Sequence, residues 1–316
     1  MIRSIEIDAR GATNRGGSVG AFMGINDVNL PPEGEPDPLS WLYYEDIRLR
    51  GRTQGIVCMR WVECTVARSA VTDMWNPDSH VQGAFISGSQ VRFHVIDSVF
   101  YRNGYKEDPS ASDDPQRTIF DRNFYMGGGA QMGVSFDGVL SAYGGSGGPQ
   151  IRYGGSMQDS LVMEGYWFTA TGSNGNLPSW IDPQEGQSFD VHDNVMLVFK
   201  YDTPNLPGER DARTHPGNGF HIGGASFGGS FERNIISGAL LTELGVGEGF
   251  GRPGMHLIGA QLRESGLYPR DYAVRDNIVY GFTGIRFSGE AWDQVSGIEV
   301  TGNVWADRGG TAGVTD

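Results

Sequence analysis

Six side chains of the kinds that bind acidic sugars occupy the same position of a repeated six-residue pattern. Aromatic rings stack on the faces of sugar rings, and arginine forms paired hydrogen bonds with carboxylates. The third position of the pattern holds, in chain order, Phe85, Tyr125, Arg152, His221, His256 and Arg286. On consecutive parallel strands about 4.8 Å apart, these side chains would form one continuous stripe. The stripe predicts an elongated surface for an anionic ligand.

The pattern that carries these residues is typical of short β-strands that end in a glycine. It reads GAFISG from Gly83, NFYMGG from Asn123, QIRYGG from Gln150, GFHIGG from Gly219, GMHLIG from Gly254 and GIRFSG from Gly284. Because alternate side chains of a strand point to opposite faces, the apolar second and fourth positions are predicted to face inward. These inward pairs are Ala84/Ile86, Phe124/Met126, Ile151/Tyr153, Phe220/Ile222, Met255/Leu257 and Ile285/Phe287.

A second pattern alternates with the first along the chain. It reads VIDSV from Val95, SFDGV from Ser135, MQDSL from Met157, VHDNV from Val191, FERNI from Phe231, VRDNI from Val274 and VTGNV from Val300. Its recurring aspartates are interpreted as turn residues; they are Asp97, Asp137, Asp159, Asp193 and Asp276. Its asparagines predict a ladder of amide hydrogen bonds between coils; they are Asn194, Asn234, Asn277 and Asn303.

Short strands, turn glycines and aligned columns, without a helical period, favour an all-β fold, a right-handed parallel β-helix of about nine coils. An antiparallel sandwich or a propeller is the alternative, but sandwich strands need not share a column and no propeller-blade signature occurs. We expect a single domain over residues 1–316, with residues 1–40 forming a first coil or an N-terminal cap. Residues 105–117 and 201–218 are predicted to be long loops.

The composition is that of a folded, turn-rich, acidic protein. The 316 residues include 49 glycines and carry a formal net charge of −14. This charge argues against a nucleic-acid partner, because phosphate backbones require a basic surface. No apolar run long enough for a membrane span or a signal peptide occurs. Cys58 and Cys64 are too few for a disulfide scaffold and are predicted to be small buried residues.

Four segments resemble a bacterial group of right-handed parallel β-helix repeat proteins related to pectate lyases and alginate lyases. The segments are SHVQG (79–83), RNG (102–104), FDRNFYM (120–126) and GPQIRYGG (148–155), within about a quarter of the chain. In that group a His-Ser-Gln-Gly-like turn, an Asn-Gly, an Asn-x-Tyr strand and a Gln-x-Arg-x-Gly-Gly strand recur. Here Val81 stands in place of the serine and Arg122 in place of a common histidine. Phage tailspikes share this fold.

The resemblance implies a site on adjacent coils formed by His80, Gln82, Asn103, Asn123, Tyr125, Gln150 and Arg152. β-Elimination on a uronic-acid polysaccharide needs a group that neutralises the carboxylate, a base and an acid. The predicted catalytic residues are Arg152 as neutraliser, His80 as base and Tyr125 as acid. The predicted substrate-binding residues are Gln82, Phe85, Asn103, Asn123, Gln150, His221, His256 and Arg286.

Two other functions remain open on the same fold. Hydrolysis needs two carboxylates about 5 to 9.5 Å apart, and Asp121 is the carboxylate that we retain for it, because the repeated aspartates fit turns. A non-catalytic carbohydrate-binding or tailspike assembly module needs only the exposed stripe. His94 and His192 lie in or beside strand columns and are interpreted as structural.

No cofactor is expected, and the expected partner is an acidic polysaccharide or oligosaccharide, without nucleic acid or membrane. Calcium is the alternative neutraliser, with Asp97, Asp121 and Asp137 as oxygen ligands, although no calcium-loop spacing is present. A homo-oligomer, a trimer in the tailspike case, is a further expectation. Such partners predict an extracellular, periplasmic or phage-virion location.

Overall fold

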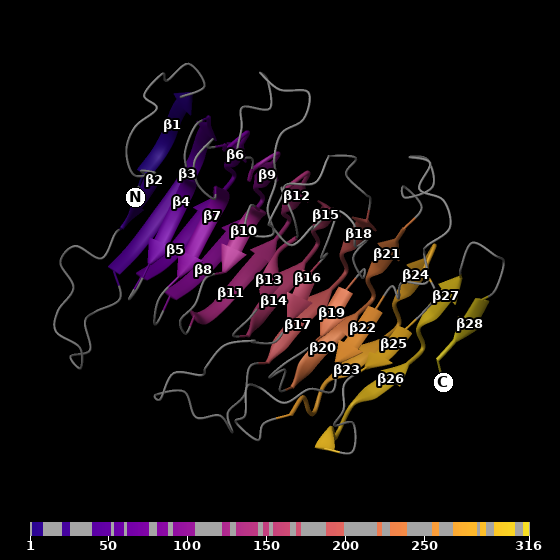
Figure 1. Cartoon of the computed structure of the whole chain (residues 1–316). Helices are drawn as coiled ribbons and strands as arrows, with labels where there is room; N and C mark the ends of the chain where they lie inside the picture. The colour runs from indigo at the N-terminus through magenta and orange to yellow at the C-terminus, as the bar shows by residue number, and fades with distance from the viewer. Residues whose placement is uncertain are drawn as a thin grey trace, which may run out of the picture.

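The chain is all-β, and its strands stack side by side from the N-terminal to the C-terminal end of the molecule (Figure 1). The structure is a computed structural model. It describes residues 2–8, 21–25, 40–51, 54–59, 62–75, 81–87, 91–104, 122–126, 131–144, 148–151, 154–164, 169–171, 188–198, 220–222, 228–238, 255–258, 268–282, 285–288, 294–306 and 312–315. Within these ranges, no helix is long and apolar enough to cross a membrane.

The largest sheet consists of two rows of parallel strands joined by bends. The first row contains β5 (Val62–Ala67), β8 (Val91–Ile96), β11 (Gln131–Asp137), β14 (Gly155–Gln158), β17 (Phe189–His192), β20 (Gly229–Glu232), β23 (Ala273–Arg275) and β26 (Glu299–Thr301). The second row contains β6 (Ala70–Thr72), β9 (Val99–Tyr101), β12 (Leu140–Ala142), β15 (Leu161–Glu164), β18 (Val195–Val198), β21 (Ile235–Ser237), β24 (Ile278–Tyr280) and β27 (Val304–Ala306). The longer strands β1 (Ile2–Asp8) and β3 (Ser40–Arg50) extend along both rows.

Two smaller parallel sheets complete the described part of the fold. One contains β2 (Ala21–Ile25), β4 (Gln54–Met59), β7 (Gln82–Ser87) and β10 (Arg122–Met126). The other contains β13 (Gln150–Ile151), β16 (Thr169–Thr171), β19 (Phe220–Ile222), β22 (Met255–Ile258) and β25 (Ile285–Ser288). The described strands make one antiparallel pair, β27 with β28 (Ala312–Val314). From β4 to β27, paired strands are three elements apart in the chain, so each three-strand unit returns to the row where it began.

The predicted inward positions form the core. Nine of them are at most 1% exposed: Ala84, Ile86, Phe124, Met126, Ile151, Phe220, Ile222, Met255 and Leu257. Ile285 is partly buried against the same core, whereas Phe287 is 51% exposed, so the prediction is wrong for Phe287. Both lie on β25, the edge strand of the five-stranded sheet as described, where no described strand covers the far side. Tyr153 lies outside the described residues.

The bend between the first and second rows contains a residue with a positive φ angle. Four of the five recurring aspartates occupy it, Asp97, Asp159, Asp193 and Asp276, with φ angles of 46°, 49°, 58° and 56°. Aspartate tolerates this left-handed conformation better than most residues because its short side chain bonds to the local backbone. The interpretation of these four as turn residues is therefore confirmed.

The fifth aspartate, Asp137, is not at the bend. It pairs with Ile96 and Gln158 inside the strands, and Gly138, with a φ angle of 64°, takes the bend position. The alignment of SFDGV was wrong by one residue because glycine fits a positive φ as well as aspartate does. As a result Phe136, rather than Ser135, faces the core.

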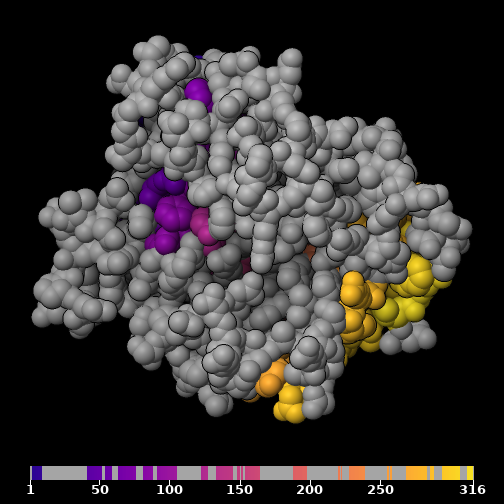
Figure 2. All heavy atoms as spheres, viewed as in Figure 1, coloured from indigo at the N-terminus to yellow at the C-terminus, as the bar shows by residue number. Residues whose placement is uncertain are grey.

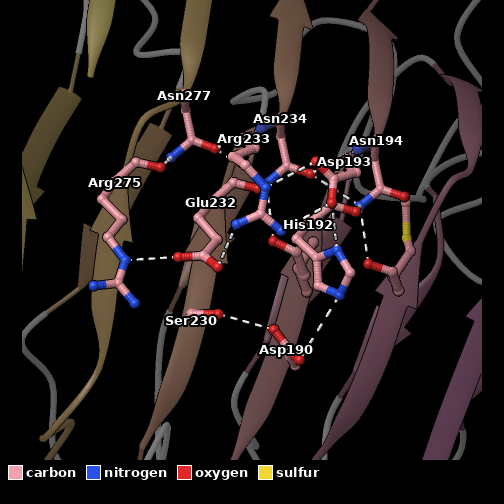
Figure 3. Close-up of polar contacts among 12 residues, drawn as sticks. Asp190, His192, Asp193, Asn194, Ser230, Glu232, Arg233, Asn234, Arg275 and Asn277 are labelled. Atoms are coloured by element: carbon pink, nitrogen blue, oxygen red, sulfur yellow. Dashed lines mark hydrogen bonds and ion pairs between the residues drawn. The ribbon is translucent and has the colours of Figure 1, made fainter. Parts of the chain in front are cut away.

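Buried asparagines form the predicted ladder directly after this bend (Figure 3). The amide of Asn194 donates to Oδ1 of Asn234 (2.9 Å), that of Asn234 to Asn277 (3.0 Å), and that of Asn277 to Asn303 (2.8 Å). Each accepting oxygen also takes the backbone N–H of the preceding asparagine. In the preceding coil Ser160 holds the same position, and its N–H donates to Asn194. At the bend, the backbone N–H groups of these asparagines have no strand partner. The side-chain oxygens of the ladder accept their hydrogen bonds instead.

Cys58 and Cys64 are fully buried, as predicted, but they also form a disulfide. Cys58 lies on β4 and Cys64 on β5, so the bond links the four-stranded sheet to the first row. Because the two strands belong to different sheets, the six-residue spacing alone did not reveal that their side chains meet. The expectation of two unbridged cysteines is therefore corrected.

Candidate functional site

Two stacked aromatic rings lie on the outer face of the four-stranded sheet. Phe85 on β7 is in register with Tyr125 on β10, and their ring centroids are 5.8 Å apart with planes within 7° of parallel. Both side chains are partly exposed, whereas Val57, the next residue of the row on β4, is buried. Purple and magenta atoms from this half of the chain reach the surface in Figure 2. The rings form an aromatic platform, which we define as Phe85 and Tyr125.

A cationic side chain lies beside the platform. The guanidinium carbon of Arg122 is 5.8 Å from the centroid of the Tyr125 ring, within the range of a cation–π contact. Arg122 is only 3% exposed and is in register with Gln82. The sequence showed Arg122 merely as a departure from a family histidine. Its place at the first residue of the Asn-x-Tyr strand was the signal that would have assigned it to the site.

Asn103 and Asn123 lie in the interior rather than on the ligand-facing surface. Both are 0% exposed, and the amide of Asn103 donates to Oδ1 of Asn123 at 2.8 Å. Oδ1 of Asn103 accepts the N–H of Met74, and the amide of Asn123 donates to the carbonyl of Ala142. These bonds form a second, shorter asparagine ladder at the bend after the second row. Both asparagines thus have a structural role; their assignment as sugar ligands stays a prediction that their burial does not support.

Gln82 is also buried, with 2% exposure, and its Oε1 accepts a hydrogen bond from the amide of Gln54 at 2.8 Å. The glycine that follows it is required by the second ladder. A Cβ atom on Gly83 would lie 2.6 Å from the amide nitrogen of Asn103, too close for any side chain. Gly83 therefore allows β7 to lie against the ladder. The burial of Gln82 does not support its predicted substrate contact, which stays a prediction.

Three predicted site residues lie outside the described residues: the catalytic candidates His80 and Arg152, and the alternative carboxylate Asp121. Their predicted roles stay predictions. His80 precedes Val81, which leads into β7, and Arg152 follows Ile151, the last residue of β13. Strands β10 and β13 contact one another.

The strand register changes the predicted outward stripe. The residues in register across the five-stranded sheet are Gln150, Ala170, His221, His256 and Arg286. Gln150 therefore takes the place expected for Arg152, which follows two residues later in the sequence. Ala170 interrupts the row on β16. The sequence did not predict this strand because threonines, Thr169 and Thr171, stand where the pattern has apolar residues. Since β10 and β13 belong to different sheets, the expected continuous stripe is divided in two.

The first row carries a network of ion pairs on its outer face (Figure 3). Arg233 donates to both carboxylate oxygens of Asp193 at 2.9 Å and to Glu232 at 2.6 Å, and Arg275 donates to Glu232 at 2.6 Å. Hydrogen bonds from Arg233, and next from His192, lower the pKa of Asp193 to about 2. The hydrogen bond from Arg275 lowers the pKa of Glu232 against the opposing effect of burial. Both carboxylates stay ionised at neutral pH, so neither suits the general acid of a hydrolase.

Comparisons with protein-family models, with curated proteins and with solved structures find no match for this chain. Within the described ranges, no group of three or more His, Cys, Asp or Glu side chains is arranged to hold a metal ion. Asp121, one of the three oxygen ligands considered for calcium, lies outside those ranges. The functional argument therefore starts from the aromatic platform and Arg122.

Proposed function

We propose that the chain is a right-handed parallel β-helix that binds an acidic polysaccharide across the outer face of β7 and β10 and cleaves it by β-elimination. Three features support the helix: the three-element interval between paired strands, the positive-φ bends and the asparagine ladders. The right hand follows from the strong preference of parallel strand connections for that hand.

The aromatic platform is the observation that carries the binding proposal. The partly exposed parts of the two rings offer an apolar aromatic surface that can contact the apolar face of a sugar ring. Arg122 is only 3% exposed, so it contributes the field of a buried positive charge beside Tyr125 rather than a direct ligand contact, on a chain whose formal net charge is −14. A local cation is needed because the rest of an acidic protein repels a polyanion.

The proposed chemistry uses the phenol of Tyr125, one of the two platform rings. A phenol there can donate a proton to the leaving oxygen of a sugar stacked on the ring. In this proposal His80 removes the proton next to the carboxylate and Arg152 neutralises that carboxylate, which stabilises the developing negative charge. Elimination breaks the glycosidic bond and leaves an unsaturated uronate at the new end of the chain.

The test distinguishes the contribution of the Tyr125 ring to binding from the contribution of its hydroxyl to catalysis. Polygalacturonate and alginate are incubated with wild type, Tyr125→Phe and Tyr125→Ala, and the ultraviolet absorbance of the unsaturated product and the number of reducing ends are followed. Tyr125→Phe should retain binding while turnover falls about a hundredfold or more, since general acid catalysis contributes that much. Tyr125→Ala should lose both. Tyr280→Phe, which changes an exposed tyrosine on β24, is the matched control and should behave as wild type.

The other outcomes would each overturn part of the proposal. New reducing ends without the absorbance would show hydrolysis and direct attention to Asp121. Binding without any cleavage would show a carbohydrate-binding module. Unchanged turnover in Tyr125→Phe would remove Tyr125 from the chemistry, and the same experiment on Arg152→Ala tests the neutralising group.

A further inference from the structure

The outer face of the first row brings together a carboxylate, an imidazole and a hydroxyl from three consecutive coils. Nδ1 of His94 on β8 lies 2.7 Å from Oγ of Ser135 on β11, and the two residues are opposite one another in the strand register. Nε2 of His94 lies 3.8 Å from Oε1 of Glu63 on β5. This order, hydroxyl to base to carboxylate, is the arrangement that activates a nucleophilic serine.

The surroundings of His94 favour the form that can accept a proton. Burial lowers the pKa of the imidazole, Glu63 opposes that shift and Arg92 adds to it. A neutral ring with its proton on Nε2, toward Glu63, leaves Nδ1 as the acceptor for the Ser135 hydroxyl. About a third of the His94 side chain is exposed, and Ser135 is partly exposed, so a ligand can reach both groups.

We propose that Ser135, His94 and Glu63 form a second catalytic site, a serine esterase that removes small O-acyl groups from a polysaccharide. Ser135 is the nucleophile, His94 the general base and Glu63 a positioning residue that orients the imidazole. The site lies in the first row of the largest sheet, whereas the aromatic platform lies on the four-stranded sheet, so this activity does not depend on the proposed elimination.

The reaction runs in two balanced steps. Oγ of Ser135 attacks the ester carbonyl carbon while its proton passes to Nδ1 of His94. The bond between that carbon and the sugar oxygen then breaks, and the sugar oxygen takes the proton from His94. Water attacks the acyl-serine in the same way, releasing the carboxylic acid and restoring Ser135.

The neighbours of the site define its substrate class. Ser156 on β14 is in register with Ser135 and partly exposed, so its hydroxyl adjoins the nucleophile as a hydrogen-bond donor for the ester oxygen. The site lies on a sheet face rather than at a bend or strand end, and a sheet face accommodates an extended chain that carries a small acyl group. An acylated sugar polymer has both properties.

The same row supplies a matched control. Through β14 and β17, Ser135 is in register with Ser230 on β20. The hydroxyl of Ser230 donates to Oδ1 of Asp190 at 2.8 Å instead of to an imidazole. Both serines are partly exposed on the same sheet face, but only Ser135 has the base that would activate it.

The experiment measures p-nitrophenyl acetate hydrolysis and labelling by a fluorophosphonate, with the modified residue identified by peptide mass spectrometry. We expect label on Ser135 and none on Ser230, loss of hydrolysis in Ser135→Ala, and a loss of about a hundredfold or more in His94→Gln. Glu63→Gln should lower the rate less and shift its pH profile, while Ser230→Ala should match wild type. Thermal unfolding confirms that each variant is folded. Equal labelling of the two serines, or hydrolysis that survives Ser135→Ala, would overturn the proposal.

Discussion

The asparagine column between the first and second rows and the aromatic platform on β7 and β10 both consist of residues that repeat from one strand to its paired neighbour. The asparagines point into the core, whereas the rings point outward. Asn234 is fully buried and its amide group bonds with both neighbouring coils. Phe85 and Tyr125 are partly exposed and stack on one another. The difference teaches that a repeated buried amide joins successive three-strand units by hydrogen bonds, whereas a partly exposed outward ring can contact a ligand.

Asn103 and Asn123 resemble the asparagine column in their burial and hydrogen bonding, although they lie elsewhere in the fold. The dipeptide Arg102–Asn103 repeats Arg233–Asn234, and both arginines have a φ angle of 55°. In each case the arginine makes the bend and the asparagine turns inward to bond between coils. Asn123 instead lies within β10, and its burial and its bonds to Asn103 and Ala142 are what give it a structural role.

The largest expected effect is on the asparagine column. Asn234→Ala removes the acceptor of two buried N–H donors of Asn194 and the donor to Asn277, and should lower the free energy of unfolding by roughly 3 kcal/mol. Urea unfolding measures this loss. Ser230→Ala on the same coil is the control, with an expected change below about 0.5 kcal/mol. A loss below about 1 kcal/mol for Asn234→Ala would show that the ladder is not the main restraint at this bend.

The second effect sharpens the assignment of Asn123. Asn123→Ala should lower the free energy of unfolding by roughly 2 kcal/mol, because the amide of Asn103 and the carbonyl of Ala142 lose a buried partner. The affinity of the folded variant for polygalacturonate should fall less than that of Phe85→Ala. A large loss of affinity with unchanged stability would return Asn123 to the ligand surface and contradict the comparison.

The third effect concerns the platform itself. Phe85→Ala should weaken polysaccharide binding about tenfold, the equivalent of roughly 1.4 kcal/mol, with a smaller change in stability because the ring is partly exposed. Isothermal titration gives the affinity. Phe287→Ala is the matched control, since that ring is 51% exposed on another sheet. Equal affinities of Phe85→Ala and Phe287→Ala for the polysaccharide would show that the platform is not the binding surface.

The smallest effect is the acid dependence of the ion-pair network. Because the pKa of Asp193 is lowered from 3.8 to about 2, its contribution to stability is present above about pH 4 and is lost as the pH falls toward 2. Solvent screening keeps this contribution small, since both side chains are largely exposed. Unfolding temperatures of wild type and Arg233→Gln should therefore differ slightly at pH 5, where Asp193 is ionised. They should converge near pH 2, where Asp193 is taking up its proton. If the difference in unfolding temperature persists near pH 2, it arises from a group other than Asp193.

The strand columns could be predicted from the sequence because side-chain direction alternates with a fixed period of two. That rule placed Phe124 and Leu257 inside, and the turn preference of aspartate placed Asp193 at its bend. The asparagine ladder followed because the same amide recurred at one position in successive coils, which only stacking explains.

The remaining features depend on register and on contacts between sheets, which the local pattern does not encode. Gln150 and Arg152 are two residues apart in the sequence, so alternation alone cannot decide which one aligns with His221. The disulfide joins Cys58 and Cys64 from two different sheets. The contact of His94 with Ser135 likewise required the one-residue correction at Gly138, which turned Ser135 outward.

The most direct test of the central claim is the affinity of polygalacturonate and alginate for wild type, Phe85→Ala and Tyr125→Ala, measured by isothermal titration with neutral dextran as the reference. The account predicts that wild type binds at least one of the acidic polymers and not dextran, and that each ring deletion weakens binding about tenfold or more while the fold is retained. Acidic polymers that bind both variants as tightly as wild type, or that do not bind wild type at all, would contradict it.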